Sequence, residues 1–158
     1  MGTEEGFSGP QVCDVVGITY RQLDYWDRTD LLKPSLRTAH GSGTQRRYSY
    51  RDLVQIKVIK SLLDAGVKLQ NTRKAIESLR SDHGANWQTA SLVLDGGNSV
   101  LVNDDEGLID LLRGGQRVLN VVPVGHMQAE LDASIVALAP RREAAAGELV
   151  AHQVAQGG

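Results

Sequence analysis

Basic, amide and aromatic side chains alternate in two stretches in the first half of the chain. Residues 19–28 read Thr-Tyr-Arg-Gln-Leu-Asp-Tyr-Trp-Asp-Arg, and residues 33–47 contain four further lysines and arginines. Arginine and glutamine donate hydrogen bonds to the edges of bases, and cations beside a duplex neutralise its phosphates. The chemistry that this pattern indicates is recognition of nucleic acid.

The second half of the chain indicates no catalytic chemistry. In residues 91–139 no nucleophile stands with a base, and His126 is the only imidazole. The three acids of residues 104–106 could ligate a cation, but acids at the start of a helix are also favoured by the helix dipole. Cys13 is the only cysteine, which excludes a disulfide within the chain and a cysteine-rich zinc site. We therefore expect no cofactor and no enzymatic activity.

Two short helices must position the first polar stretch. Capping-box pairs, in which Gln follows Ser or Thr by three residues, begin at Ser8 and at Thr19, and Gly17 stands between them. The pattern predicts one helix that ends at Gly17 and a second that runs from Tyr20 to about Arg28. Two capped helices joined by a glycine turn are typical of a helix-turn-helix, whose second helix can enter the major groove.

The second polar stretch predicts a hairpin beside that helix. Residues 32–48 begin with a proline turn, pass through a Gly-Ser-Gly tip and return through Arg-Arg-Tyr. Apolar residues then recur at helical spacing over residues 49–64 and 69–80, which predicts a pair of helices. A basic hairpin next to a candidate recognition helix is a wing that can lie along the phosphate backbone.

The C-terminal half alternates short strands and helices. A hairpin is predicted over residues 91–102, a helix after the acids of 104–106, a third strand over 118–122 and a last helix over 125–138. A unit of about 50 residues is near the lower size limit for an independent core. It gains by burying one face against a copy of itself, so we interpret it as a dimerisation domain. A site for an effector is the alternative.

Composition and charge separate the same two halves. Residues 1–80 contain 13 Lys and Arg against 9 Asp and Glu, for a net charge of +4, whereas residues 81–158 contain 4 against 10, for a net charge of −6. One half is therefore suited to a polyanion and the other is not. No apolar run approaches the ~18 residues that span a bilayer, and the N-terminus lacks a signal peptide, so we expect a cytoplasmic protein with no membrane partner.

The predicted fold class is α+β, with an N-terminal winged helix-turn-helix and helix pair followed by a small α/β C-terminal domain. The predicted parts are a flexible leader (1–7), the winged helix-turn-helix domain (8–81), a linker (82–90), the dimerisation or effector domain (91–139) and a flexible tail (140–158).

Four short motifs resemble the MerR family of bacterial regulators in their order and spacing. They are residues 19–28, Leu31-Leu32-Lys33-Pro34, Arg46-Arg47-Tyr48-Ser49 and Asp52-Leu53. The resemblance covers about residues 8–80. Most members continue into one long helix that pairs antiparallel with its twin, and we expect that helix to be missing here.

The resemblance implies a sequence-specific transcription regulator. It would bind double-stranded DNA as a homodimer on an inverted repeat, and family activators distort promoter DNA so that RNA polymerase can engage it. An architectural or excisionase-like DNA-binding protein is the alternative. No particular small-molecule effector is indicated.

The resemblance also implies positions. Thr19, Arg21 and Gln22 would lie at the groove, Tyr25 and Arg46 would touch phosphates, and Lys68 and Arg73 would approach DNA from a second wing and the fourth helix. An ion pair within the wing is the alternative for Arg46, and a role as wing anchor is the alternative for Tyr48. The full predicted DNA-binding set is Thr19, Tyr20, Arg21, Gln22, Tyr25, Arg28, Arg37, Gln45, Arg46, Arg47, Tyr48, Lys68 and Arg73.

Overall fold

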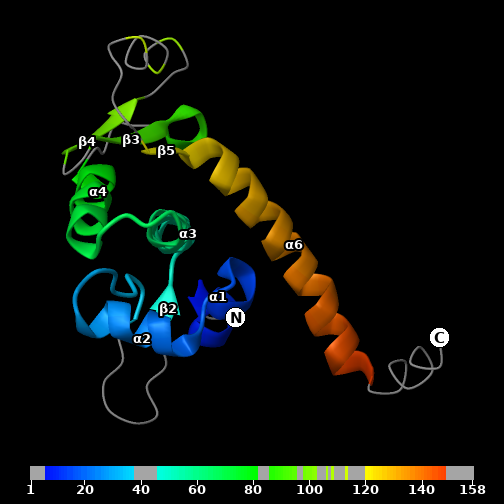
Figure 1. The fold of residues 1–158 in the computed structure, drawn as a ribbon. Helices are drawn as coiled ribbons and strands as arrows, with labels where there is room; N and C mark the ends of the chain where they lie inside the picture. The colour runs from blue at the N-terminus through cyan, green and yellow to red at the C-terminus, as the bar shows by residue number, and fades with distance from the viewer. Residues whose placement is uncertain are drawn as a thin grey trace.

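The computed structural model describes residues 6–37, 46–81, 86–95, 98–102, 106, 108, 113 and 120–148 of the 158-residue chain. The elements in chain order are β1 (Phe7–Ser8), α1 (Gly9–Val16), α2 (Tyr20–Arg28), β2 (Arg47–Tyr48), α3 (Tyr50–Asp64), α4 (Leu69–Ser81), the 3-10 helix η1 (Trp87–Thr89), β3 (Ser91–Asp95), β4 (Asn98–Val102), β5 (Asn120–Pro123) and α6 (Val124–Glu148). Helix α3 lies at the centre, with α1 and α2 on one side and the larger sheet on the other (Figure 1). The predicted α+β class is confirmed.

Two helices begin at the predicted capping boxes, and α3 begins at a third box of the same kind. At Ser8, Thr19 and Ser49, the hydroxyl accepts a hydrogen bond from the backbone N–H three residues later, and the side chain of that later residue accepts one from the cap backbone. Gly17 ends α1 in the left-handed region, with φ of 84°, and its N–H donates to the Cys13 carbonyl. The predicted helix-turn-helix is confirmed, because each boundary is fixed by local hydrogen bonds.

The wing begins as a small antiparallel arrangement. Strand β2 pairs with β1, so that Phe7 lies opposite Tyr48, and a bridge between Arg37 and Arg47 continues the pairing on the other side. The tip of the predicted wing, residues 38–45, lies outside the described residues. Phe7 also packs against the core, so the predicted leader boundary is corrected: the folded part begins before Ser8.

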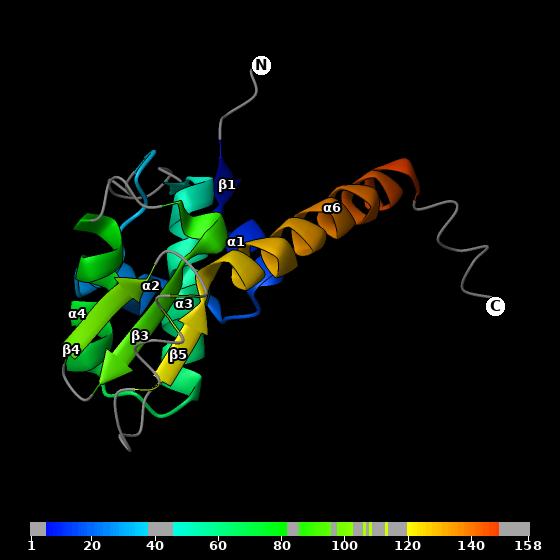
Figure 2. The same ribbon diagram turned by 90° about the horizontal axis from the view of Figure 1, so that it is seen from above.

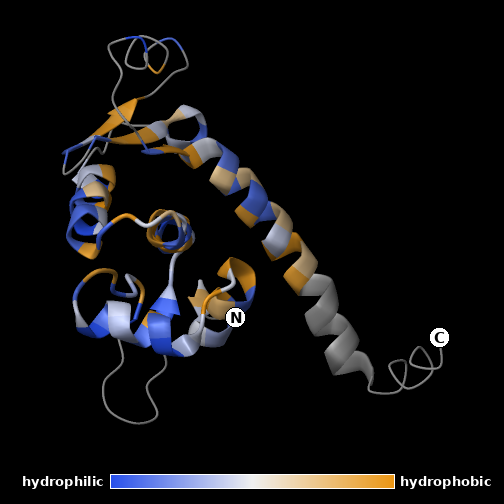
Figure 3. Ribbon diagram, viewed as in Figure 1, coloured by the Kyte–Doolittle hydropathy of each residue, from blue (hydrophilic) through white to orange (hydrophobic). Residues whose placement is uncertain are grey.

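The N-terminal and C-terminal halves share one hydrophobic core. Helix α3 contributes buried side chains from every side of its axis, which is why it lies at the centre. Strand β3 is the middle strand of an antiparallel sheet of order β4-β3-β5, and its Leu92 and Leu94 belong to the same core cluster. Figure 3 shows β3 as largely hydrophobic, in contrast to the hydrophilic α2.

Part of the predicted linker belongs to this core. Trp87 in η1 is only 3% exposed. The guanidinium of Arg51 lies over its ring, 3.7 Å from the centroid. A large aromatic surface is removed from water here, so residues 86–90 connect the halves as packed structure and not as a linker. Residues 82–85 lie outside the described part of the chain.

Helix α6 is longer than the sequence predicted. Its Leu131 and Leu138 are buried in the core, and it packs along α3 and α1 before extending away from the body (Figures 1 and 2). The predicted end near residue 138 and the predicted tail from residue 140 are corrected, because the helix continues to Glu148. A long C-terminal helix of 25 residues is therefore present, although it follows the sheet. None of the described helices combines the length and the apolar composition that a membrane span requires.

Candidate nucleic-acid interface

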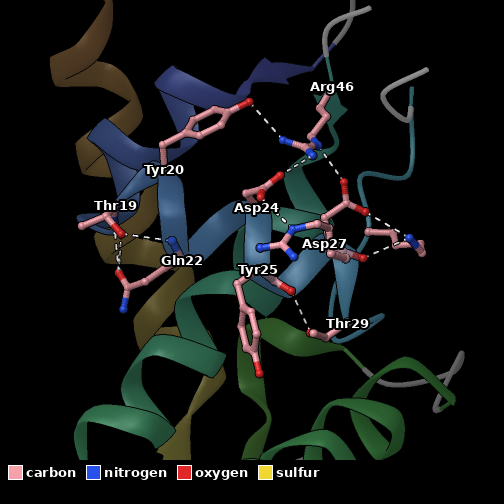
Figure 4. Close-up of polar contacts among 10 residues, drawn as sticks. Thr19, Tyr20, Gln22, Asp24, Tyr25, Asp27, Thr29 and Arg46 are labelled. Carbon is pink, nitrogen blue, oxygen red and sulfur yellow. Dashed lines mark hydrogen bonds and ion pairs between the residues drawn. The ribbon is translucent and has the colours of Figure 1, made fainter. Parts of the chain in front are cut away.

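Helix α2 is held by its apolar face and presents an open polar face. Leu23 and Trp26 are buried, at 0% and 3% exposure. Residues four and three apart share a helix face, so Arg21, Tyr25 and Arg28 form a stripe, and all three are exposed. Tyr25 is 45% exposed, and its ring projects away from the other labelled side chains in Figure 4. We call these three residues, with Gln22 beside them, the open stripe.

The residues predicted to contact DNA at the start of α2 have two different roles. The Thr19 hydroxyl accepts from the Gln22 N–H at 3.0 Å and donates to Gln22 Oε1 at 3.4 Å. Gln22 Oε1 also accepts from the Thr19 N–H at 3.0 Å. Thr19 is therefore the helix cap, whereas the Gln22 amide keeps its Nε2 donor for another partner. Arg21 has no hydrogen-bond or ion-pair partner among the described residues.

The opposite polar face of α2 points to the wing and is fully engaged. Arg46 lies between Tyr20, Asp24 and Asp27 (Figure 4). Its Nε donates to Asp27 Oδ2 at 2.6 Å, its Nη2 to Asp24 Oδ1 at 2.7 Å, and its Nη1 to the Tyr20 hydroxyl at 3.0 Å. The Arg46 side chain is only 12% exposed. Arg46 therefore pairs with α2, whereas the alternative to its predicted phosphate contact was an ion pair within the wing.

Further charges extend this cluster on both sides. Asp24 accepts from Arg28 at 2.8 Å, and Asp27 accepts from Lys33 at 3.1 Å. The hydrogen bonds from Arg28 and then Arg46 lower the pKa of Asp24, because they favour its charged form. Burial opposes the charged form of Arg46, but its hydrogen bonds to the two carboxylates outweigh burial and raise its pKa. Asp24 and Arg46 therefore stay ionised together.

The root of the wing is fixed to α3 by a buried carboxylate. Asp52 is 5% exposed. Its Oδ2 accepts from the Ser35 N–H at 2.8 Å, the Ser35 hydroxyl at 2.7 Å and the Ser49 N–H at 2.8 Å. Tyr48 is fully buried, and burial raises its pKa. The prediction that Tyr48 contacts DNA is corrected: it anchors the wing in the core.

The other predicted residues are dispersed. Arg37 is exposed and Arg47 half-buried, both at the described base of the wing, whereas Gln45 lies outside the described residues. Lys68 is exposed just before α4. Arg73 on α4 lines a hollow of about 30 Å³ together with Asp30, two residues after the end of α2. The structure thus places Arg73 beside the segment that follows α2, but it gives Lys68 no described side-chain partner.

Sequence reasoning missed the two aspartates of the cluster. Asp24 and Asp27 are three residues apart on α2, and this spacing places both carboxylates on one face. Two acids on a helix that is expected to meet a polyanion require a cation nearby. This requirement could have predicted that a basic residue of the wing pairs with Asp24 and Asp27. Among the described residues, no group of three His, Cys, Asp or Glu gathers at a possible metal site. Of the acids at 104–106, only Glu106 is described, and it is exposed.

Comparison with known proteins agrees with this geometry. Residues 7–79 match the family described as MerR HTH family regulatory protein. The chain is 44% identical over 123 residues to HTH-type transcriptional regulators of Mycobacterium bovis and of Mycobacterium tuberculosis. These matches cover 78% of the chain and 55% of each relative. The chain therefore spans about half the length of the curated relatives it matches.

Proposed function

Because residues 7–79 belong to the MerR HTH family of regulatory proteins, we propose that this chain is a transcription regulator that binds a specific double-stranded DNA sequence. The observation that carries the proposal is the open stripe of α2, which lies beside a wing anchored to the same helix. A single helix fits the major groove, and a wing beside it reaches the neighbouring backbone.

Each residue of the open stripe has a donor suited to DNA. Arg21 is exposed and has no described partner, so its guanidinium can make a bidentate contact with guanine or a charge-assisted contact with phosphate. Gln22 Nε2 and the Tyr25 hydroxyl are further donors on the same surface. Arg28 is shared with Asp24 at 2.8 Å, but its side chain is 64% exposed and can also reach a phosphate.

We further propose that the protein acts as a homodimer on an inverted repeat and distorts promoter DNA where RNA polymerase binds. A symmetric dimer places two copies of α2 on two half-sites. The C-terminal sheet offers surface for such a contact. Val100 on β4 and Val121 on β5 are 50% and 38% exposed, and both lie opposite Val93 of β3, so they belong to one exposed apolar row across the sheet.

A binding titration with genomic DNA fragments tests the proposal. Arg21→Ala is expected to weaken specific binding by about 5- to 150-fold, the effect of losing roughly 1–3 kcal/mol of a base or phosphate contact. Binding should also fall steeply with added salt, because phosphate contacts release counterions.

Lys57→Ala is the matched control for Arg21→Ala. Lys57 is paired with Glu130 of α6 at 3.4 Å, so the substitution removes the same charge from the side of α3 that faces α6. Equal binding losses in the two variants would show that α2 is not the reading element. Absence of any specific fragment for the wild-type chain would overturn the proposal as a whole.

A further inference from the structure

We propose that Tyr20, Asp24, Asp27 and Arg46 form a latch that fixes the wing to α2, and that Arg46 is a positioning residue for DNA recognition which does not itself bind phosphate. We call these four residues the wing latch. The inference rests on the proposed DNA-binding function and deepens it, because it assigns the acids of α2 a role in that function.

The first argument is that each nitrogen of the Arg46 guanidinium already has a partner. All three Arg46 nitrogens have a partner within α2, at 2.6 Å to Asp27, 2.7 Å to Asp24 and 3.0 Å to Tyr20. The guanidinium carbon also lies 5.9 Å from the centroid of the Tyr20 ring. The guanidinium keeps two N–H donors beyond these three bonds, but the Arg46 side chain is only 12% exposed, which leaves a phosphate little access to them.

The second argument concerns the aspartates. The Asp27 side chain is 10% exposed and the Asp24 side chain 32% exposed. Removing the cation would leave a buried carboxylate without its main partner, on a helix that approaches a polyanion. Breaking one partner from a buried ion pair is strongly unfavourable. The positive charge of Arg46 is therefore neutralised by Asp24 and Asp27 in the absence of DNA.

The third argument is the place of Arg46 in the chain. Arg46 directly precedes β2, where the Arg47 N–H donates to the Arg37 carbonyl at 2.8 Å and closes the base of the wing. A contact at this point sets the angle between the wing and the open stripe of α2. DNA must meet both elements at once, so a fixed angle lowers the entropy that binding has to remove.

Asp27→Asn distinguishes the latch from direct phosphate binding by Arg46, because the two hypotheses predict opposite changes in DNA affinity. If Arg46 binds phosphate, loss of Asp27 frees its guanidinium and removes a repulsive charge, so DNA affinity rises. If the latch operates, the wing loses its fixed angle and affinity falls by about tenfold or more. Tighter binding by Asp27→Asn overturns the inference.

Two comparisons make the titration specific. Asp64→Asn removes the same charge from an ion pair on α3 with Lys60, and it is expected to leave affinity unchanged or slightly higher. Arg46→Gln should lower the affinity by the same amount as Asp27→Asn while the slope of the salt dependence is kept, because no phosphate contact is lost, and the double variant should add little. Additive losses would show two independent contacts and overturn the latch.

A measurement without DNA keeps the latch testable if the proposed function fails. Amide hydrogen exchange of Arg47 reports the closed base of the wing, and it should accelerate in Asp27→Asn and Arg46→Gln but not in Asp64→Asn. Unchanged protection would overturn the latch while leaving DNA binding by Arg21 intact. If Asp27→Asn does not fold, as judged by far-UV circular dichroism, Tyr20→Phe removes one latch contact and should accelerate exchange to a smaller extent.

Discussion

The wing and helix α6 are attached to the same central helix by different forces. The wing root is held by polar groups: Asp52 accepts three hydrogen bonds from Ser35 and Ser49, and the wing latch adds ion pairs to α2. Helix α6 is held mainly by apolar burial, since Leu131 is 1% exposed and Leu138 is 7% exposed.

This difference has consequences for how each attachment responds to salt. Ion pairs depend on geometry and on salt, so the attachment of the wing base should weaken as salt is added. Apolar burial depends on packed volume and changes little with salt. We infer that salt separates the two attachments, because it acts on the wing base and leaves the contact of α6 with the core unchanged.

The largest effect is expected where the apolar attachment of α6 is cut. Leu131→Ala should lower the free energy of unfolding by about 2–5 kcal/mol, because it leaves a cavity in the shared core. Urea denaturation followed by circular dichroism measures the loss. Val136→Ala, on the exposed side of the same helix, is the control and should change stability by less than about 0.5 kcal/mol. Similar losses in both variants would contradict the assigned face of α6.

A smaller effect is expected at the polar attachment of the wing. Ser49→Ala removes the cap of α3 and the contact between the Ser49 and Ser35 hydroxyls at 3.1 Å. It should lower the free energy of unfolding by roughly 0.5–2 kcal/mol. Ser61→Ala, inside the same helix, should be neutral or slightly stabilising, because alanine has the higher helix propensity. A destabilising Ser61→Ala with a neutral Ser49→Ala would contradict the role of the cap.

What the sequence could predict depends on how far apart the interacting residues lie along the chain. The three capping boxes were predictable because each is closed between residues three apart, as at Ser49 and Asp52. The pairing of β1 with β2 was not, because Phe7 meets Tyr48 across a long stretch of sequence. Helix α6 was predicted too short, because the alanine-rich segment after residue 138 was interpreted as a frayed tail although alanine is the strongest helix former.

The sequence predicted the helix and the wing of the candidate site, but it did not predict the ion pairs between them. An exposed arginine at the start of α2 follows from the capping pattern alone, so Arg21 was placed correctly on the surface. The partners of Arg46 lie 19 and 22 positions away. No local pattern decides whether a guanidinium meets a phosphate or a carboxylate at that separation. The close approach of the wing to α2, which is a tertiary feature, decides it.

A third prediction concerns a polar contact between α6 and the first residue of α3. The Tyr50 hydroxyl donates to Asp132 at 2.6 Å. Burial, and then this bond, raise the pKa of Tyr50 from 10.0 to about 12. Tyr50→Phe should lower the free energy of unfolding at neutral pH by about 0.5–1.5 kcal/mol.

The sign of the pH dependence follows from that raised pKa. The contribution of Tyr50 to stability is complete below pH 10, and it is lost as the pH rises toward about 12, because the unfolded chain ionises first. Urea titrations at several alkaline pH values should therefore show a shallower decline for Tyr50→Phe than for the wild type. Parallel declines would show that the Tyr50 hydroxyl does not couple folding to pH.

The smallest effect on stability is expected in the open stripe. Arg28 pairs with Asp24 at a site where its side chain is 64% exposed, and exposed pairs of this spacing contribute about 0.3–0.5 kcal/mol. Arg28→Ala should thus leave the free energy of unfolding nearly unchanged, since Asp24 keeps Arg46 as a partner. Its effect should instead appear in DNA affinity and in a reduced salt dependence, as measured by titration at several salt concentrations. A variant that loses stability but binds DNA as the wild type does would place Arg28 with the wing latch, and the open stripe would then be limited to Arg21, Gln22 and Tyr25.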